Sequence, residues 1–149
     1  MQNNEELMRL ALEVAHNATQ TGDIPVGAIV VNSDGVIIGK GFNEREATND
    51  PTAHAEIVAI RSAAGRLQKS RLDGCTLIVT LEPCAMCAGA IAQSRMSKLV
   101  FGAWDAKAGA VGSVWDVIRD PRSIFKVEVI SGVLEAECAA VLTDFFKDK

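Results

Sequence analysis

The chain has 149 residues, of which 48% are hydrophobic and 23% are charged, and its formal net charge is −4. This length suits one domain with a single core, so we expect one domain over residues 1–149. No apolar run approaches the roughly 20 residues of a membrane-spanning helix. The N-terminal residues lack the basic-then-apolar pattern of a secretory signal, and we therefore expect a soluble, cytoplasmic protein without a membrane partner.

Hydrophobic periodicity predicts the first elements of the chain. Apolar residues recur at helical spacing over residues 4–21, and Gly22 follows as a stop signal. Two apolar runs, residues 26–31 and 36–42, flank an Asp34-Gly35 pair, which is typical of a β-hairpin.

The middle of the chain alternates between helices and strands. Residues 43–50 are polar and predict a loop, and Asp50-Pro51 is a helix-start signal, so we expect a helix over residues 52–64 that Gly65 ends. The apolar run 77–81 predicts a strand that is buried on both faces. Pro83 ends this strand and begins a helix over residues 84–94.

Two further strands, residues 98–102 and 126–130, are separated by 23 residues, which is long enough for a crossover with a helical turn at residues 114–118. These two strands are therefore expected to be parallel. An amphipathic helix over residues 134–145 completes the chain. The sequence thus predicts an α/β fold with a five-stranded mixed sheet in which strands four and five are parallel.

Two short motifs, His54-Ala55-Glu56 and Pro83-Cys84-Ala85-Met86-Cys87, carry the chemistry of this chain. Two cysteines three positions apart can bind one metal ion, and a distant histidine supplies a third ligand. His54, Cys84 and Cys87 are the predicted ligands of one zinc ion per chain, with the fourth tetrahedral position open for water. Glu56 is the predicted catalytic base, because zinc lowers the pKa of its water to about 7 and a carboxylate can then move protons.

Helix geometry constrains where these side chains can meet. Residues two apart on a helix point about 200° apart, so His54 and Glu56 can serve one site only off the N-terminal end of their helix. The alternative, a purely structural zinc site, would require a fourth Cys or His and would leave Glu56 without a role. Cys75 and Cys138 are more simply interpreted as buried thiols.

The charges are unevenly distributed along the chain. Residues 1–60 carry a net charge of −6, residues 61–126 carry +5, and residues 127–149 carry −3. A basic block between two acidic ends is a modest indication of a surface that faces phosphate groups.

The two motifs resemble those of the cytidine deaminase-like superfamily, and the resemblance covers nearly the whole chain. It implies a three-layer α/β/α fold. The run Phe101 to Ser113, together with Pro25 to Ala28 and Asp50 to Glu56, is similar to segments of the bacterial tRNA-specific adenosine deaminases. This resemblance implies conversion of the wobble adenosine of an arginine tRNA anticodon to inosine, by a zinc-dependent homodimer that binds the anticodon stem-loop.

The same resemblance suggests four residues that contact the substrate. Asn43 would hydrogen-bond the nucleoside, and the backbone near Ala55 would lie against the base. Asp105 and Lys107 fall in the segment that would contact the flanking nucleotides. Two simpler interpretations stay open: Asn43 can serve a turn, and Lys107 can be a solvated charge.

Two other functions are compatible with the motifs. A small-molecule purine deaminase that acts on guanine would use the same metal and the same proton shuttle, but it would not need the basic block or the Phe101 to Ser113 run. A non-catalytic RNA-binding subunit would keep zinc for stability alone, and in it Glu56 would be dispensable.

Overall fold

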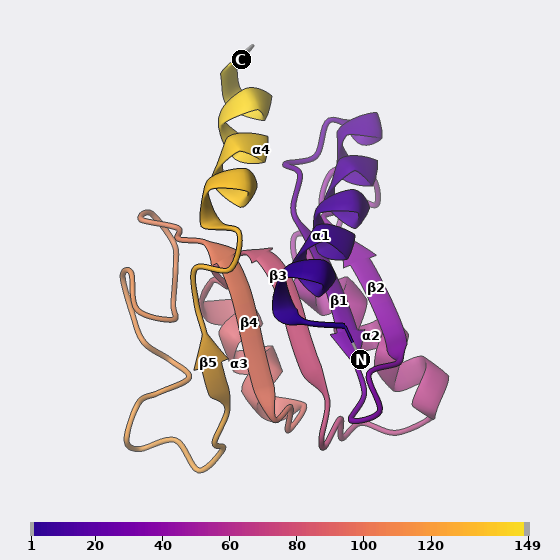
Figure 1. The fold of residues 1–149 in the computed structure, drawn as a ribbon, viewed down its shortest axis with the longest axis vertical. Coiled ribbons are helices and arrows are strands. Elements are labelled where there is room, and N and C mark those ends of the chain that lie inside the picture. Colours follow the sequence, from indigo (N-terminus) through magenta and orange to yellow (C-terminus); the bar gives the residue numbers. More distant parts are fainter. Residues whose placement is uncertain (1, 148–149) are drawn as a thin grey trace.

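The computed structural model describes residues 2–147, which form a five-stranded sheet with helices on both faces (Figure 1). In chain order the elements are α1 Asn4–Ala15, the 3₁₀ helix η1 His16–Thr21, β1 Gly27–Val31, β2 Ile37–Phe42, α2 Ala55–Leu67, β3 Thr76–Leu81, α3 Ala85–Gln93, β4 Lys98–Ala103, β5 Glu128–Ile130 and α4 Glu135–Lys147. The strand order is β2-β1-β3-β4-β5. Strand β1 is antiparallel to β2 and β3, whereas β3, β4 and β5 are parallel, which confirms the predicted mixed sheet.

The central strands send alternate side chains into two separate cores. Leu77 and Val79 of β3 pack with the alanine-rich faces of α2 and α3, whereas Ile78 between them packs against α1 and α4. All three side chains are fully buried, as predicted for a strand covered on both faces. The molecule therefore has three layers, with α2 and α3 on one side of the sheet and α1 and α4 on the other (Figure 1).

The first helix is shorter than predicted. It is α-helical only to Ala15 and continues as a 3₁₀ helix to Thr21, with Gly22 in the left-handed conformation at its end. Within this turn the hydroxyl of Thr19 donates to the carbonyl of His16, and that of Thr21 donates to the carbonyl of Ala18. These local side-chain bonds compete with the regular α-helical pattern, which explains the change of helix type.

Helix α2 is displaced by three residues from its predicted position. Asp50 accepts hydrogen bonds from the backbone amide and the hydroxyl of Thr52, so it closes a turn before the helix instead of capping it. The helix begins at Ala55 and passes through Gly65 to Leu67, where Gln68 adopts the left-handed conformation. The predicted stop at Gly65 is therefore wrong.

The crossover between β4 and β5 contains no helical turn. Residues 114–118 form bends and an isolated bridge between Val111 and Asp116. The amides of Val111 and Ser113 donate to the carboxylate of Glu82, and they are therefore not available for a helix. The other predicted ends agree with the structure within two residues.

Two glycines on β2 allow α2 to lie directly against the sheet. A Cβ atom at Gly41 would be 2.5 Å from the carbonyl oxygen of Ala55 and 2.5 Å from the amide nitrogen of Ala59. Gly39 meets the next turn of α2 in the same way. These contacts fix the height of the first turn of α2, where the His54-Ala55-Glu56 motif lies.

Among residues 2–147, none of the helices combines the length and the apolar character that a membrane span requires.

We predict that Gly41→Ala lowers the free energy of unfolding by roughly 1–3 kcal/mol, because the new methyl group overlaps the backbone of α2. The matched control is Gly65→Ala in the same helix, where a Cβ atom would have no neighbour within 4 Å. It should raise the free energy of unfolding by about 0.5–1 kcal/mol, since alanine favours a helix over glycine. Urea unfolding measures both values, and equal effects of the two substitutions would contradict the packing argument.

Candidate active site

The N-termini of two helices supply the predicted metal ligands. His54 is the N-cap of α2 and Cys84 is the N-cap of α3, and both have extended backbones with ψ angles of 154° and 177°. Their carbonyl groups accept the first helical hydrogen bonds, from Val58 and Ala88. Neither side chain makes the capping hydrogen bond that is usual at this position, so both are free to point toward a shared ligand.

The three side chains form a group of the size that zinc requires. The Nδ1 atom of His54 lies 3.6 Å from the sulfur of Cys84 and 3.6 Å from the sulfur of Cys87, and all three ligand atoms lie within 4.8 Å of one another. Tetrahedral zinc with ordinary Zn–N and Zn–S lengths would hold such atoms about 3.6 Å apart. The donor set of one imidazole and two thiols therefore fits zinc in both geometry and chemistry.

The protonation of the two thiols is unequal in the protein alone. The hydrogen bond with Cys87 lowers the pKa of Cys84 to about 4. The same hydrogen bond is the main cause that raises the pKa of Cys87 above its ordinary value, and burial is the second cause. The pair thus shares one proton, and a bound metal ion would displace it, since coordinating thiols are deprotonated.

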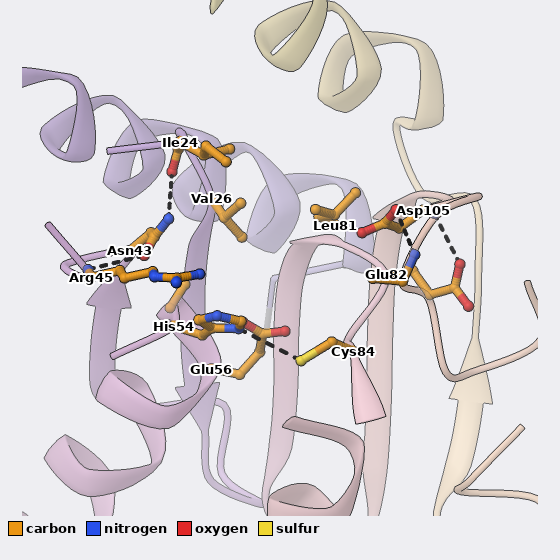
Figure 2. A pocket seen from close by; sticks show the side chains of 12 residues that line it. Ile24, Val26, Asn43, Arg45, His54, Glu56, Leu81, Glu82, Cys84 and Asp105 are labelled. Atoms are coloured by element: carbon orange, nitrogen blue, oxygen red, sulfur yellow. Dashed lines mark hydrogen bonds between the residues drawn. The ribbon is translucent and has the colours of Figure 1, made fainter. Parts of the chain in front are cut away.

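Glu56 lies in the first turn of α2 and lines the same pocket as His54 (Figure 2). Because His54 precedes the helix in an extended conformation, the two side chains are not bound by the 200° rotation of a regular helix. The Glu56 side chain is 4% exposed, and its burial raises its pKa to about 7. A carboxyl group with this pKa can both accept and donate a proton near neutral pH.

These groups line a cavity of about 220 Å³ (Figure 2). Its walls are Ile24, Val26, Asn43, Arg45, His54, Ala55, Glu56, Leu81, Glu82, Cys84, Asp105 and Ala108. Pockets for drug-sized ligands usually measure about 300–1,000 Å³, so this cavity suits a single small ring system. Apolar walls with a few convergent polar groups are typical of a binding site for an organic molecule.

Comparison with known proteins identifies the family. Residues 1–103 match the model of the cytidine and deoxycytidylate deaminase zinc-binding region. The chain is 50% identical over 146 residues to the tRNA-specific adenosine deaminase of Haemophilus influenzae, an alignment that covers 98% of this chain and 84% of that protein. The chain belongs to the tRNA-specific adenosine deaminase family. The family model and the His54, Cys84 and Cys87 group together make it a zinc-dependent deaminase with one zinc site per chain.

Solved structures agree with this assignment. One from a study of A-to-I editing by tRNA:A34 deaminases at the wobble position of transfer RNA superposes with a TM-score of 0.88 at 43% identity, over 92% of this chain and 99% of that chain. The guanine deaminase of Nitrosomonas europaea superposes with a TM-score of 0.81 at 28% identity, over 97% of this chain and 85% of that chain. The predicted cytidine deaminase-like fold is thereby confirmed.

The structure brings together most of the predicted substrate residues of the deaminase. Asn43, Ala55 and Asp105 line the cavity, whereas Lys107 is exposed and is not among the lining residues. The backbone amide of Lys107 donates to the carboxylate of Asp105, which closes a turn. The roles of these four residues and of Glu56 remain predictions.

Sequence reasoning missed the buried carboxylate of Glu82. Its side chain is 2% exposed and accepts hydrogen bonds from the amides of Asp105, Val111 and Ser113 and from the Ser113 hydroxyl. Burial raises its pKa, but these donors outweigh burial and hold the pKa below its ordinary value. The position of Glu82 next to Pro83 was the only available signal, because its partners lie more than 20 residues away.

A second buried carboxylate holds the opposite rim of the cavity. Asp23 is 1% exposed and accepts hydrogen bonds from the backbone amides of Glu46 and Ala47 and from the hydroxyl of Thr21. The segment from Asn43 to Ala47 is therefore anchored to the residues that precede β1. No spacing or motif in the sequence indicated this contact.

None of the basic residues of the predicted block, residues 61–126, lines the cavity. The site follows the carboxyl ends of β3 and β4, where Glu82 and Asp105 are found. Lys98 begins β4 and Lys126 precedes β5, and because these strands are parallel, both lysines lie at the opposite edge of the sheet. The net charge of residues 61–126 is therefore a poor guide to the charge at the site.

We predict that Glu82→Gln lowers the free energy of unfolding at pH 7 by about 2–3 kcal/mol, since it removes charge-assisted hydrogen bonds from a buried acceptor. The pKa of Glu82 is depressed in the folded protein, so its contribution is complete above the unfolded value near pH 4.3 and is lost as pH falls through the folded pKa. The difference between wild type and variant should therefore shrink toward pH 3, although both lose zinc there.

The control for this measurement is Glu128→Gln on β5, which is exposed and should change stability by less than about 0.5 kcal/mol. A difference between wild type and Glu82→Gln that stays constant from pH 7 to pH 3 would contradict an ionised Glu82.

Proposed function

We propose that this protein hydrolyses the wobble adenosine of a tRNA anticodon, that of arginine tRNA, to inosine, and that residues 1–149 act as a single zinc-dependent deaminase domain. The observation that carries the proposal is the 50% identity to a tRNA-specific adenosine deaminase over 98% of the chain. A tRNA substrate also supports the expected cytoplasmic location.

The residues divide the reaction between them. His54, Cys84 and Cys87 would hold zinc, which would activate a water molecule as the nucleophile. Glu56 would accept a proton from this water and deliver it to a ring nitrogen of the purine, and it would then move the remaining proton of the added hydroxyl group to the leaving amino group. Adenosine and water thus give inosine and ammonia, and the pKa of Glu56 near 7 suits both halves of this transfer.

The size of the cavity supports a mechanism in which one base of the RNA unstacks and enters the site. A volume of about 220 Å³ suits one purine ring, so the ribose and the neighbouring nucleotides remain at the rim. Asn43 lies at this rim, where its amide nitrogen donates to the carbonyl of Ile24 and its oxygen accepts from the amide of Arg45. An amide nitrogen carries two protons, and the second can reach the nucleoside. Loops of RNA present bases that are extracted at low cost.

The alternative substrate is free guanine. Guanine deaminases of similar fold favour it, but at 28% and 36% identity against the 50% of the tRNA-specific relative. Both activities would use the same ligands and the same carboxylate, so the zinc site itself does not separate them. An assay with each substrate is therefore needed to separate the two activities.

The decisive experiment incubates the zinc-loaded protein with an arginine tRNA anticodon stem-loop and, separately, with guanine. We expect inosine in the RNA at the wobble position, measured by mass spectrometry of the digested RNA, and no ammonia from guanine. Ammonia from guanine without inosine in the RNA would reverse the assignment.

Glu56→Ala serves as the control variant in this assay. It should bind zinc in the same ratio as wild type, measured by atomic emission, and form inosine at least about 100-fold more slowly, because proton transfer contributes about 10²–10⁴-fold. Undiminished turnover would refute the proton-transfer role of Glu56 and leave the substrate assignment in place.

We also propose that the protein is a homodimer, through an apolar patch made of Met86, Val114 and Trp115. These three side chains are 38%, 45% and 55% exposed. Gly109 brings their backbone segments together, since it forms a bridge with Cys84, two residues before Met86, and accepts hydrogen bonds from the amides of Val114 and Trp115. Exposed apolar side chains on neighbouring segments are typical of an interface.

We expect the wild-type protein to sediment as a dimer at micromolar concentration and Trp115→Glu to sediment as a monomer, because a charge at the centre of the patch opposes burial. The matched control is Ile124→Glu, at a side chain that is 82% exposed and lies outside the patch. It should remain a dimer. Sedimentation velocity measures all three proteins, and a dimeric Trp115→Glu variant would place the interface elsewhere.

A further inference from the structure

Arg45 is the single Lys or Arg among the twelve residues that line the cavity. Figure 2 shows its side chain extending from the rim, with the guanidinium group near His54. Within residues 2–147, no hydrogen-bond acceptor or ion-pair partner is found for this guanidinium, and the residue is exposed. A cation that points over a substrate pocket without a partner is available to a ligand.

The backbone beneath Arg45 is held on both sides. Its own amide donates to the side-chain oxygen of Asn43 at 3.2 Å, and the next two amides, of Glu46 and Ala47, donate to the buried carboxylate of Asp23 at 2.6 and 3.1 Å. The segment therefore needs little ordering when a ligand arrives. An anchored arginine loses less conformational freedom on binding than one on a mobile loop.

The charges around Arg45 indicate what kind of ligand it can hold. The other ionisable groups that face the cavity, apart from the metal ligands, are the carboxyl groups of Glu56, Glu82 and Asp105. Glu44 and Glu46 flank Arg45 along the chain. An anionic group of a substrate would be repelled at these positions and attracted at Arg45. The planar guanidinium matches phosphate oxygens in particular.

We propose that Arg45 binds a backbone phosphate that adjoins the adenosine in the cavity, so that the site selects a nucleotide within an RNA strand over a free nucleobase. The inference rests on the proposed RNA substrate. It follows from the cavity size as well, because a pocket that accepts only the base leaves the adjoining phosphates at the rim, where the guanidinium lies.

The test measures binding of an anticodon stem-loop with one adenosine in its loop. The zinc-loaded Glu56→Ala protein is used as the parent so that turnover does not alter the RNA. Arg45→Gln in this parent should weaken binding about tenfold, and Arg45→Lys should weaken it less, since a lysine keeps the charge but loses the paired donors. The salt dependence of binding should become shallower by about 0.7 in the log–log slope, which is the loss of one single-strand phosphate contact.

Two controls separate this role from a general effect. Arg9→Gln removes the same charge from an exposed arginine of α1 outside the cavity and should change binding less than twofold. The second control uses two modified RNAs. One carries a neutral methylphosphonate linkage on the 5′ side of the adenosine, and the other carries it on the 3′ side. For one of these two molecules, Arg45→Gln should cause no further loss, and that molecule identifies the phosphate.

Three results with the Arg45→Gln variant would overturn the inference. They are unchanged binding of the unmodified RNA, an equal further loss of binding with both methylphosphonate RNAs, and an altered zinc content, which would mean that Arg45 acts through His54. If the parent does not bind the RNA, the inference is refuted as well. The proposed function fails separately, when the wild-type protein binds the RNA but forms no inosine.

Discussion

The site depends on a constraint at the ends of two helices, where the N-cap side chains are used for metal binding and not for capping. His54 and Cys84 occupy positions where Ser, Thr, Asp or Asn would stabilise a helix by about 1 kcal/mol. Both helices leave that interaction unmade. Metal binding can offset it, because the ligand geometry exists only when α2 and α3 meet at the edge of the sheet. The close contact of α2 with Gly39 and Gly41 holds one of these ends in place, so packing and metal binding depend on each other.

Two glutamates beside this site show how environment assigns roles to one residue type. Glu56 and Glu82 are both almost fully buried. Burial dominates at Glu56 and raises its pKa to about 7, which suits a group that exchanges protons. Four hydrogen-bond donors surround Glu82 and keep it ionised, which suits a group that organises a loop. Glu56 therefore suits the proposed proton transfer, whereas Glu82 suits a structural role in the wall of the cavity.

The sequence predicted the strands, the mixed sheet and the metal ligands, because each depends on local patterns: apolar runs, a Cys-x-x-Cys pair and a Pro before a helix. It placed the start of α2 at residue 52, whereas Asp50 forms a turn and the helix starts at Ala55. Helix-start signals and turn signals use the same residue types, so the pattern alone does not separate them. The contacts of Asp23 and Glu82 and the proposed role of Arg45 were missed, because they arise from distant segments that meet or from a pocket that only the fold creates.

The proposed deamination of adenosine and the alternative deamination of guanine would use the same ligands and the same carboxylate, so the choice between these substrates must arise outside the zinc site. Two features outside the zinc site can select the substrate. The cavity has room for a base, and the rim faces the groups that are attached to that base. The basic block of residues 61–126 does not settle this question, since Lys98 and Lys126 lie at the far edge of the sheet. A single guanidinium over the cavity carries more information about the substrate than the net charge of a long segment, because screening confines its effect to groups within about 10 Å. In the proposed function, recognition of RNA is a property of a few rim residues on anchored loops, which is compatible with an acidic protein of net charge −4.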